Sequence, residues 1–118
     1  GSILTIASTL AERPAPGTGA YAASKAALIS LSKTVALECA AKHIRSNTLC
    51  PGIVMTDMTR GDRGQELAAD RVEAIRRLHP LGRTGDTMEV ALAALNALGN
   101  PWMTGSEIVI DGGLLVRE

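Results

Sequence analysis

The stretch that decides the fold is residues 2–25, SILTIASTLAERPAPGTGAYAASK. It begins with residues 2–8, a short run rich in Ile and Leu, which is typical of a strand buried on both faces of a parallel sheet. Residues 11–19 contain two prolines and two glycines and predict a loop. The next element starts at Ala20, so the sequence predicts a strand, a loop and then a helix.

The helix is predicted over residues 20–42, because apolar residues recur there at helical spacing with no Pro or Gly among them. Its many alanines permit close approach to a sheet or to another helix. The apolar face is expected to carry Ala27, Leu28, Leu31 and Val35.

Further elements follow in alternation. Residues 44–50 predict a second strand, 66–78 a weaker amphipathic helix, and 107–110 a third strand. A helix is expected to begin near Asp86 or Thr87, because Asp86 and Glu89 have capping-box spacing, and Gly99 suits its C-terminal cap.

The order strand, helix, strand, helices, strand predicts right-handed crossovers and a parallel sheet. With no internal repeat and no linker, residues 1–118 are expected to form one α/β unit.

Tyr21 and Lys25 are the first candidate chemical groups. Four residues advance a helix by about 6 Å and turn it by only about 40°, so both side chains share one face. An adjacent ammonium stabilises a phenolate, so such a tyrosine can exchange a proton at neutral pH. Ser8 ends the first strand, and ligands of open parallel sheets gather beyond the carboxyl ends of strands. We therefore expect Ser8, Tyr21 and Lys25 to face one crevice.

These residues resemble the catalytic segment of the short-chain dehydrogenase/reductase family, whose pattern is a Ser, a gap and Tyr-x-x-x-Lys. Residues 44–52 (IRSNTLCPG) resemble that family's "IRVN…PG" stretch, with Ser46 in place of the usual Val. Residues 51–56 (PGIVMT) are similar to its Pro-Gly-x-x-x-Thr segment, and residues 80–83 and 104–113 also fit. The resemblance covers nearly the whole chain.

The resemblance implies NAD or NADP as cofactor and a small carbonyl or alcohol as substrate. Tyr21 would be the general acid or base, Lys25 would bind the nicotinamide ribose, and Ser8 would bind the substrate oxygen. The segment containing Pro51 and Gly52 would orient the carboxamide, through the Ile53 backbone and Thr56. The most similar activities are 3-oxoacyl-carrier-protein reductases and, nearly as close, dehydrogenases of cyclic diols.

Family members are about twice this length, because a Rossmann sheet has two halves. We therefore expect the C-terminal half of a doubly wound parallel sheet, with the cofactor-binding half absent. The Gly-rich turn, the residue that selects NAD or NADP and the upstream Asn of the proton relay are not found in the sequence. The first strand would then expose an unpaired edge. Residues 56–79 correspond to the variable substrate lid.

Composition narrows the function further. Twelve basic residues balance twelve acidic ones, which disfavours nucleic-acid or membrane-surface binding. No apolar run reaches the roughly 18 residues of a spanning helix, and no signal peptide is recognisable, so a cytoplasmic protein is expected. No ligand spacing predicts a metal site. Cys39 and Cys50 are interpreted as buried apolar residues, and His43 and His79 as solvated residues at element ends.

Two functions remain open. The first is an oxidoreductase that interconverts a carbonyl and an alcohol, the isolated chain being inactive. The alternative is a catalytically inactive fragment or pseudo-enzyme that acts as a subunit-packing module. Relatives form dimers or tetramers through the long helix and the last helix–strand region, so a homo-oligomer is expected.

Overall fold

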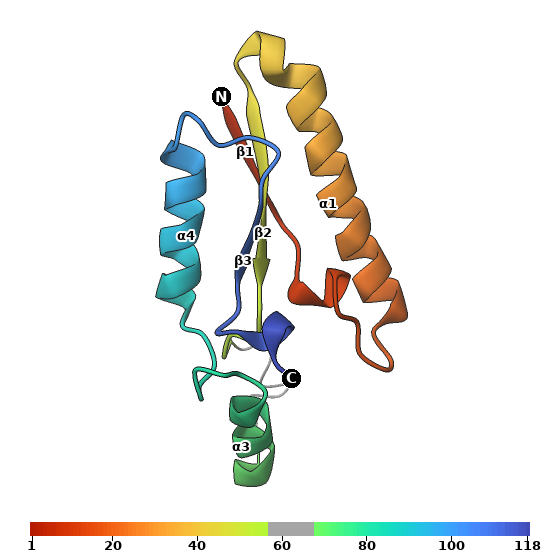
Figure 1. The fold of residues 1–118 in the computed structure, drawn as a ribbon, viewed down its shortest axis with the longest axis vertical. Helices are drawn as coiled ribbons and strands as arrows, with labels where there is room; N and C mark the ends of the chain where they lie inside the picture. The colour runs from red at the N-terminus through yellow and green to blue at the C-terminus, as the bar shows by residue number, and fades with distance from the viewer. Residues whose placement is uncertain (57–67) are drawn as a thin grey trace.

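The computed structural model describes residues 1–56 and 68–118. In these residues a parallel sheet has the order β1-β2-β3. Its strands are β1 (Ser2–Ile6), β2 (Arg45–Pro51) and β3 (Glu107–Ile110). Helix α1 (Gly19–Cys39) lies on one face and α4 (Thr87–Gly99) on the other (Figure 1). The α/β class with a parallel sheet is confirmed.

The shorter elements join these layers. Three 3-10 helices, η1 (Thr9–Ala11), η2 (Ala40–Lys42) and η3 (Leu114–Val116), follow β1, α1 and β3 in the chain. Helix α3 (Ala69–Arg77) lies beyond the carboxyl ends of the strands (Figure 1). The predicted start of this helix at residue 66 lies outside the described residues. None of the helices in the described ranges is long and apolar enough to cross a membrane.

The ends of the long helices agree in part with local sequence signals. The predicted helix 20–42 is α1 continued by η2, and it stops at exposed His43, which adopts a left-handed φ of 55°. The predicted capping box is present at α4, where Asp86 and Glu89 each accept a backbone N–H of the first turn. Gly99 is the last helical residue rather than the cap, because Asn100 takes the C-cap position in extended conformation.

The predicted apolar face of α1 is partly wrong. Leu31 is 59% exposed, and the fully buried residues of the helix are Ala22, Ser32 and Ala36. Because α1 is apolar around much of its circumference, its periodicity does not identify the packed face. Small side chains line that face instead, and the Ser32 hydroxyl lies 2.9 Å from the buried Ser46 hydroxyl of β2. The alanine-rich helix therefore packs closely on the sheet.

The burial of the strands also differs from the prediction. Ile3 and Ile6 of β1 are 45% and 46% exposed, so β1 is not buried on both faces. It lies at the edge of the sheet, as the sequence predicted, with β2 alone beside it among the described residues. The central strand β2 is the buried one, although its core segment, residues 46–50, is SNTLC.

Two polar side chains of β2, those of Asn47 and Arg45, form hydrogen bonds to the connection between α4 and β3. Asn47, fully buried, donates from Nδ2 to the Met103 carbonyl (2.8 Å) and accepts at Oδ1 from the Ser106 N–H (3.0 Å). The Arg45 guanidinium donates to three carbonyls at the end of α4 and in the loop that follows, those of Ala97, Leu98 and Met103. The "IRSN" segment thus has a structural role, since it fixes the α4–β3 connection to the sheet.

Replacing Asn47 with Ala tests this role. The change leaves the part-buried Ser106 N–H without its acceptor, which costs about 1–3 kcal/mol, whereas the Met103 carbonyl loses one of its two donors and keeps Arg45. We expect a clear loss of unfolding free energy in urea. Asn96→Ala, at an exposed asparagine of α4, is the matched control and should change stability little. Equal effects of both substitutions would contradict the assigned role.

Candidate functional site

The loops after β1 and β2 and the start of α1 meet at one end of the sheet (Figure 1). Ser8 follows β1 directly, residues 52–56 follow β2, and Tyr21 and Lys25 lie in the first two turns of α1. The Ala7 N–H donates to the Leu49 carbonyl (2.8 Å), so pairing of the strands continues up to this end. Open parallel sheets bind ligands at this end, beyond the carboxyl ends of their strands.

Lys25 joins the helix to the strand end. Its Nζ donates to the carbonyl oxygen of Ile6, the last residue of β1, at 3.0 Å. The same Nζ lies 5.5 Å from the centre of the Tyr21 ring, which is a cation–π distance. Tyr21 itself is 42% exposed. The expectation that Tyr21 and Lys25 share one helix face is therefore confirmed.

The hydroxyl group of Ser8 accepts one hydrogen bond within the chain and can still donate one. It is the N-cap of η1, and its Oγ accepts the Leu10 N–H at 3.1 Å. A hydroxyl accepts through its lone pairs and donates through its hydrogen, so this contact leaves the O–H able to donate. Convergence of the Ser8 and Tyr21 hydroxyls on one substrate atom stays a prediction.

The segment after β2, residues 52–54, is held in place by backbone contacts with the end of β3 and with Gly85. The Gly52 N–H donates to the Ile110 carbonyl (2.8 Å), and a Cβ at Gly52 would lie 2.8 Å from the Asp111 Cβ. No side chain fits there, which explains the glycine. The Ile53 carbonyl accepts the Gly85 N–H (3.0 Å), and Val54 forms a parallel bridge with Gly85.

Thr56 is the last residue described before the gap at residue 57, and its contact with a cofactor stays a prediction. The same is true of cofactor contacts at Pro51, Gly52 and Ile53. Pro51 ends β2, paired with Ile110 of β3. The structure places these residues at the sheet end where Ser8 and Lys25 also lie.

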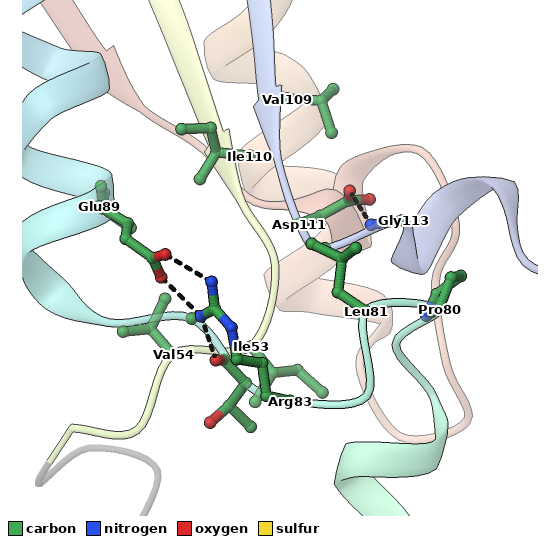
Figure 2. Close-up of a pocket in the computed structure, with 14 residues that line it drawn as sticks. Ile53, Val54, Pro80, Leu81, Arg83, Glu89, Val109, Ile110, Asp111 and Gly113 are labelled. Atoms are coloured by element: carbon green, nitrogen blue, oxygen red, sulfur yellow. Dashed lines mark hydrogen bonds and ion pairs between the residues drawn. The ribbon is translucent and has the colours of Figure 1, made fainter.

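An apolar pocket of about 470 Å³ lies behind this segment, between the start of α4 and the end of β3 (Figure 2). Its charged groups are already paired. Arg83 makes a two-pronged ion pair with Glu89 (2.9 and 2.6 Å), and the Asp111 carboxylate accepts the N–H groups of Gly113 and Leu115. The lining includes Ile53, Val54, Pro80, Leu81, Val90, Val109 and Ile110.

The Arg83 guanidinium and the Asp86 N–H lower the pKa of Glu89 to about 2. Arg83 thus connects the loop at residues 80–85 to α4. Through Gly85 the same loop supports Ile53 and Val54.

Cys50 is buried, as predicted, whereas Cys39 is only half-buried. Burial raises the pKa of the Cys50 thiol to about 11, and the nearby Glu107 carboxylate adds to the effect. A thiol that resists ionisation is a poor nucleophile, so Cys50 serves packing.

His79 contradicts the prediction of a solvated histidine, since it is only 3% exposed. The reason is tertiary, because the turn after β3 covers the ring, and no local sequence signal reveals that contact.

Almost the whole chain matches known proteins in sequence. Residues 1–115 match the family model described as Enoyl-(Acyl carrier protein) reductase. The chain is 40% identical over 114 residues to a Bos taurus 3-oxoacyl-[acyl-carrier-protein] reductase, and 41% identical over 117 residues to Carbonyl reductase family member 4 of Xenopus tropicalis. These alignments cover 97% and 99% of this chain but 45% and 46% of the relatives.

Solved structures of known proteins are also similar to this chain. A short chain dehydrogenase family protein from Francisella tularensis superposes with a TM-score of 0.86 at 31% identity, covering 99% of this chain and 52% of that one. A Serratia marcescens short-chain dehydrogenase/reductase mutant gives 0.84 at 34% identity, covering 98% and 46%. The chain therefore spans about half the length of the proteins it matches.

The Arg83–Glu89 pair predicts a pH dependence. The pKa of Glu89 is lowered in the folded chain, so the pair contributes stability fully above the ordinary value of 4.5 and loses it as pH falls toward about 2. Wild type should melt at a higher temperature than Glu89→Gln at pH 6, and the difference should vanish by pH 2. Glu73→Gln, in a more exposed ion pair with Arg77, is the control and should differ little from wild type at any pH. A Glu89→Gln difference that persists at pH 2 would exclude the ion pair as its cause.

Proposed function

Because the chain belongs to the short-chain dehydrogenase/reductase family, we propose that it carries the catalytic groups of an NAD(P)-dependent oxidoreductase that interconverts a carbonyl and an alcohol. The observation that supports this most is the Lys25 ammonium, which contacts the Tyr21 ring and the carbonyl that ends β1. This contact holds a phenol, an ammonium and a strand-end hydroxyl in one region of the fold.

The residues present fit a nicotinamide cofactor. An ammonium has three N–H donors, and Lys25 uses one on Ile6, which leaves two for the hydroxyls of a ribose. The carbonyl of Ile53 already accepts from Gly85, and the Ile53 N–H would be the backbone group that binds a carboxamide, together with Thr56 three residues later. When bound, the cofactor supplies or accepts the hydride.

Tyr21 and Ser8 act on the substrate oxygen in this proposal. In the reducing direction the Tyr21 hydroxyl gives its proton to the oxygen, and in the oxidising direction the phenolate takes it back. The Lys25 ammonium stabilises that phenolate electrostatically. The free O–H of Ser8 donates to the same oxygen and stabilises the negative charge that develops there.

The names of the relatives favour reduction of a 3-oxoacyl thioester or another small carbonyl compound. Oxidation of a cyclic diol is the competing substrate class within the same mechanism. The proposal also includes association of copies of the chain, because the outward sides of α1 and α4 expose large apolar residues. These are Leu31, Leu37, Leu92 and Leu95.

The test joins this chain to the amino-terminal half of the bovine relative, the part that the alignment leaves uncovered. The joined protein should oxidise NADPH or NADH with a 3-oxoacyl thioester. Tyr21→Phe should lower kcat by about 10²–10⁴-fold, because general acid catalysis contributes that much, and should leave cofactor binding nearly unchanged.

Thr34→Val is the matched control for that variant, since it removes one exposed hydroxyl from the same helix. It should keep wild-type turnover. An active joined protein in which Tyr21→Phe turns over as wild type would refute the assignment. No turnover with either substrate class, despite cofactor binding, would favour the subunit-packing alternative.

Lys25→Ala tests the cofactor contact. Removing hydrogen bonds from a charged donor should raise the Kd for the cofactor by about 10–100-fold in the joined protein. Fluorescence of the reduced nicotinamide measures binding without turnover. Lys42→Ala, at the far end of the helix, should bind normally. A Lys25→Ala protein with unchanged cofactor affinity would remove Lys25 from the binding site.

A further inference from the structure

His79 lies two residues beyond the last residue of α3, with its imidazole ring buried. Its Nδ1 is 2.9 Å from the carbonyl oxygen of Ile75, in the last turn of the helix. A carbonyl only accepts, so Nδ1 carries the hydrogen and donates. The last carbonyls of a helix have no partner within it, and this side chain therefore caps α3.

The other side of the ring packs on the turn that follows β3. A Cβ built on Gly112 would lie 3.5 Å from the His79 Cδ2, and Gly112 has a φ of +60°. The Nε2 atom is buried and has no hydrogen-bond partner in the part of the chain that the structure describes. The ring is thus held by one hydrogen bond and by contact with a glycine.

The residues after His79 also contact the turn that follows β3. The Leu81 N–H donates to the Gly112 carbonyl (3.2 Å), and the Gly82 N–H donates to the His79 carbonyl (2.8 Å). At Gly113 a Cβ would come within 2.8 Å of the Pro80 Cγ, so the two backbones approach closely. Residues 79–82 are therefore seated on the turn at residues 111–113.

Helix α3 itself has few other packing contacts within residues 1–56 and 68–118. None of its residues is fully buried, and only Val72 and Ile75 are half-buried. Short helices in water are marginal without tertiary packing. Its position beyond the strand ends (Figure 1) thus depends on its carboxyl end.

We propose that His79 is a positioning residue that fastens α3 to the turn after β3 and so sets how α3 covers the substrate. This inference rests on the proposed function and on the resemblance by which α3 falls in the stretch that corresponds to the variable substrate lid. His79 does not touch the reacting atoms. Its loss should weaken substrate binding and leave the chemical step unchanged.

The first test uses the 118-residue chain and amide hydrogen exchange. His79→Phe keeps a ring but removes the donor, and exchange in α3 should become about fivefold faster for one lost hydrogen bond. His79→Asn, whose side-chain N–H can replace Nδ1–H, should restore slow exchange. His43→Asn, at the exposed histidine, is the control and should leave α3 unchanged.

Three results would overturn the proposal: normal protection of α3 in His79→Phe, failure of His79→Asn to restore protection, or equal loss of protection in β2. The last would show that His79 supports the whole core rather than α3. The amides of β2 report on this because that strand is buried throughout residues 46–50.

The second test uses the joined protein. His79→Phe should raise KM for the 3-oxoacyl thioester about fivefold with kcat unchanged, and His79→Asn should reverse the rise. A fall in kcat without a change in KM would contradict a positioning role. If the joined protein is inactive in every form, the proposed function fails, while the exchange result still decides whether His79 fastens α3.

Discussion

The geometry of the site depends on one hydrogen bond, from the Lys25 ammonium to the carbonyl that ends β1. Parallel strands connected by right-handed crossovers bring their carboxyl ends to one edge, but that topology alone does not fix where a helix begins relative to a strand. The bond between Lys25 and Ile6 adds that constraint to the packing of α1 on β2, because it ties the second turn of α1 to a residue two positions before Ser8. Tyr21 lies one turn earlier on the same helix and is carried with it. A lysine that structurally joins two elements also remains able to donate to a ligand.

A second constraint acts behind the site, where buried polar groups replace an apolar core. Asn47 and Arg45 satisfy the carbonyls and N–H groups of the α4–β3 connection. Beyond the strand ends, Gly85 and Asp111 support the segment from Gly52 to Val54. Networks of this kind favour one arrangement strongly, because any shift leaves a buried donor or acceptor without its partner. The segment that would orient a cofactor is therefore rigidly supported by residues far from it in sequence.

The features that the sequence predicted correctly are those that depend on residues close together in the chain. The long helix, the Asp86–Glu89 capping box, the parallel order and the shared face of Tyr21 and Lys25 all follow from spacing, and the structure contains each of them. The sequence did not predict which side of α1 packs, because apolar residues lie around much of the helix and do not mark one face. The local sequence also could not predict the burial of β2 and of His79, because the residues that contact Asn47 and His79 lie far along the chain. Those contacts exist only once the sheet has formed.

The most direct test of the central claim is a crystal structure of the joined protein with cofactor and a carbonyl substrate analogue bound. Tyr21 Oη and Ser8 Oγ should both lie within hydrogen-bond distance of the same carbonyl oxygen, with Lys25 Nζ on the ribose. An analogue whose oxygen contacts neither hydroxyl, or two hydroxyls that point to different places, would contradict the assignment of these residues as one catalytic group.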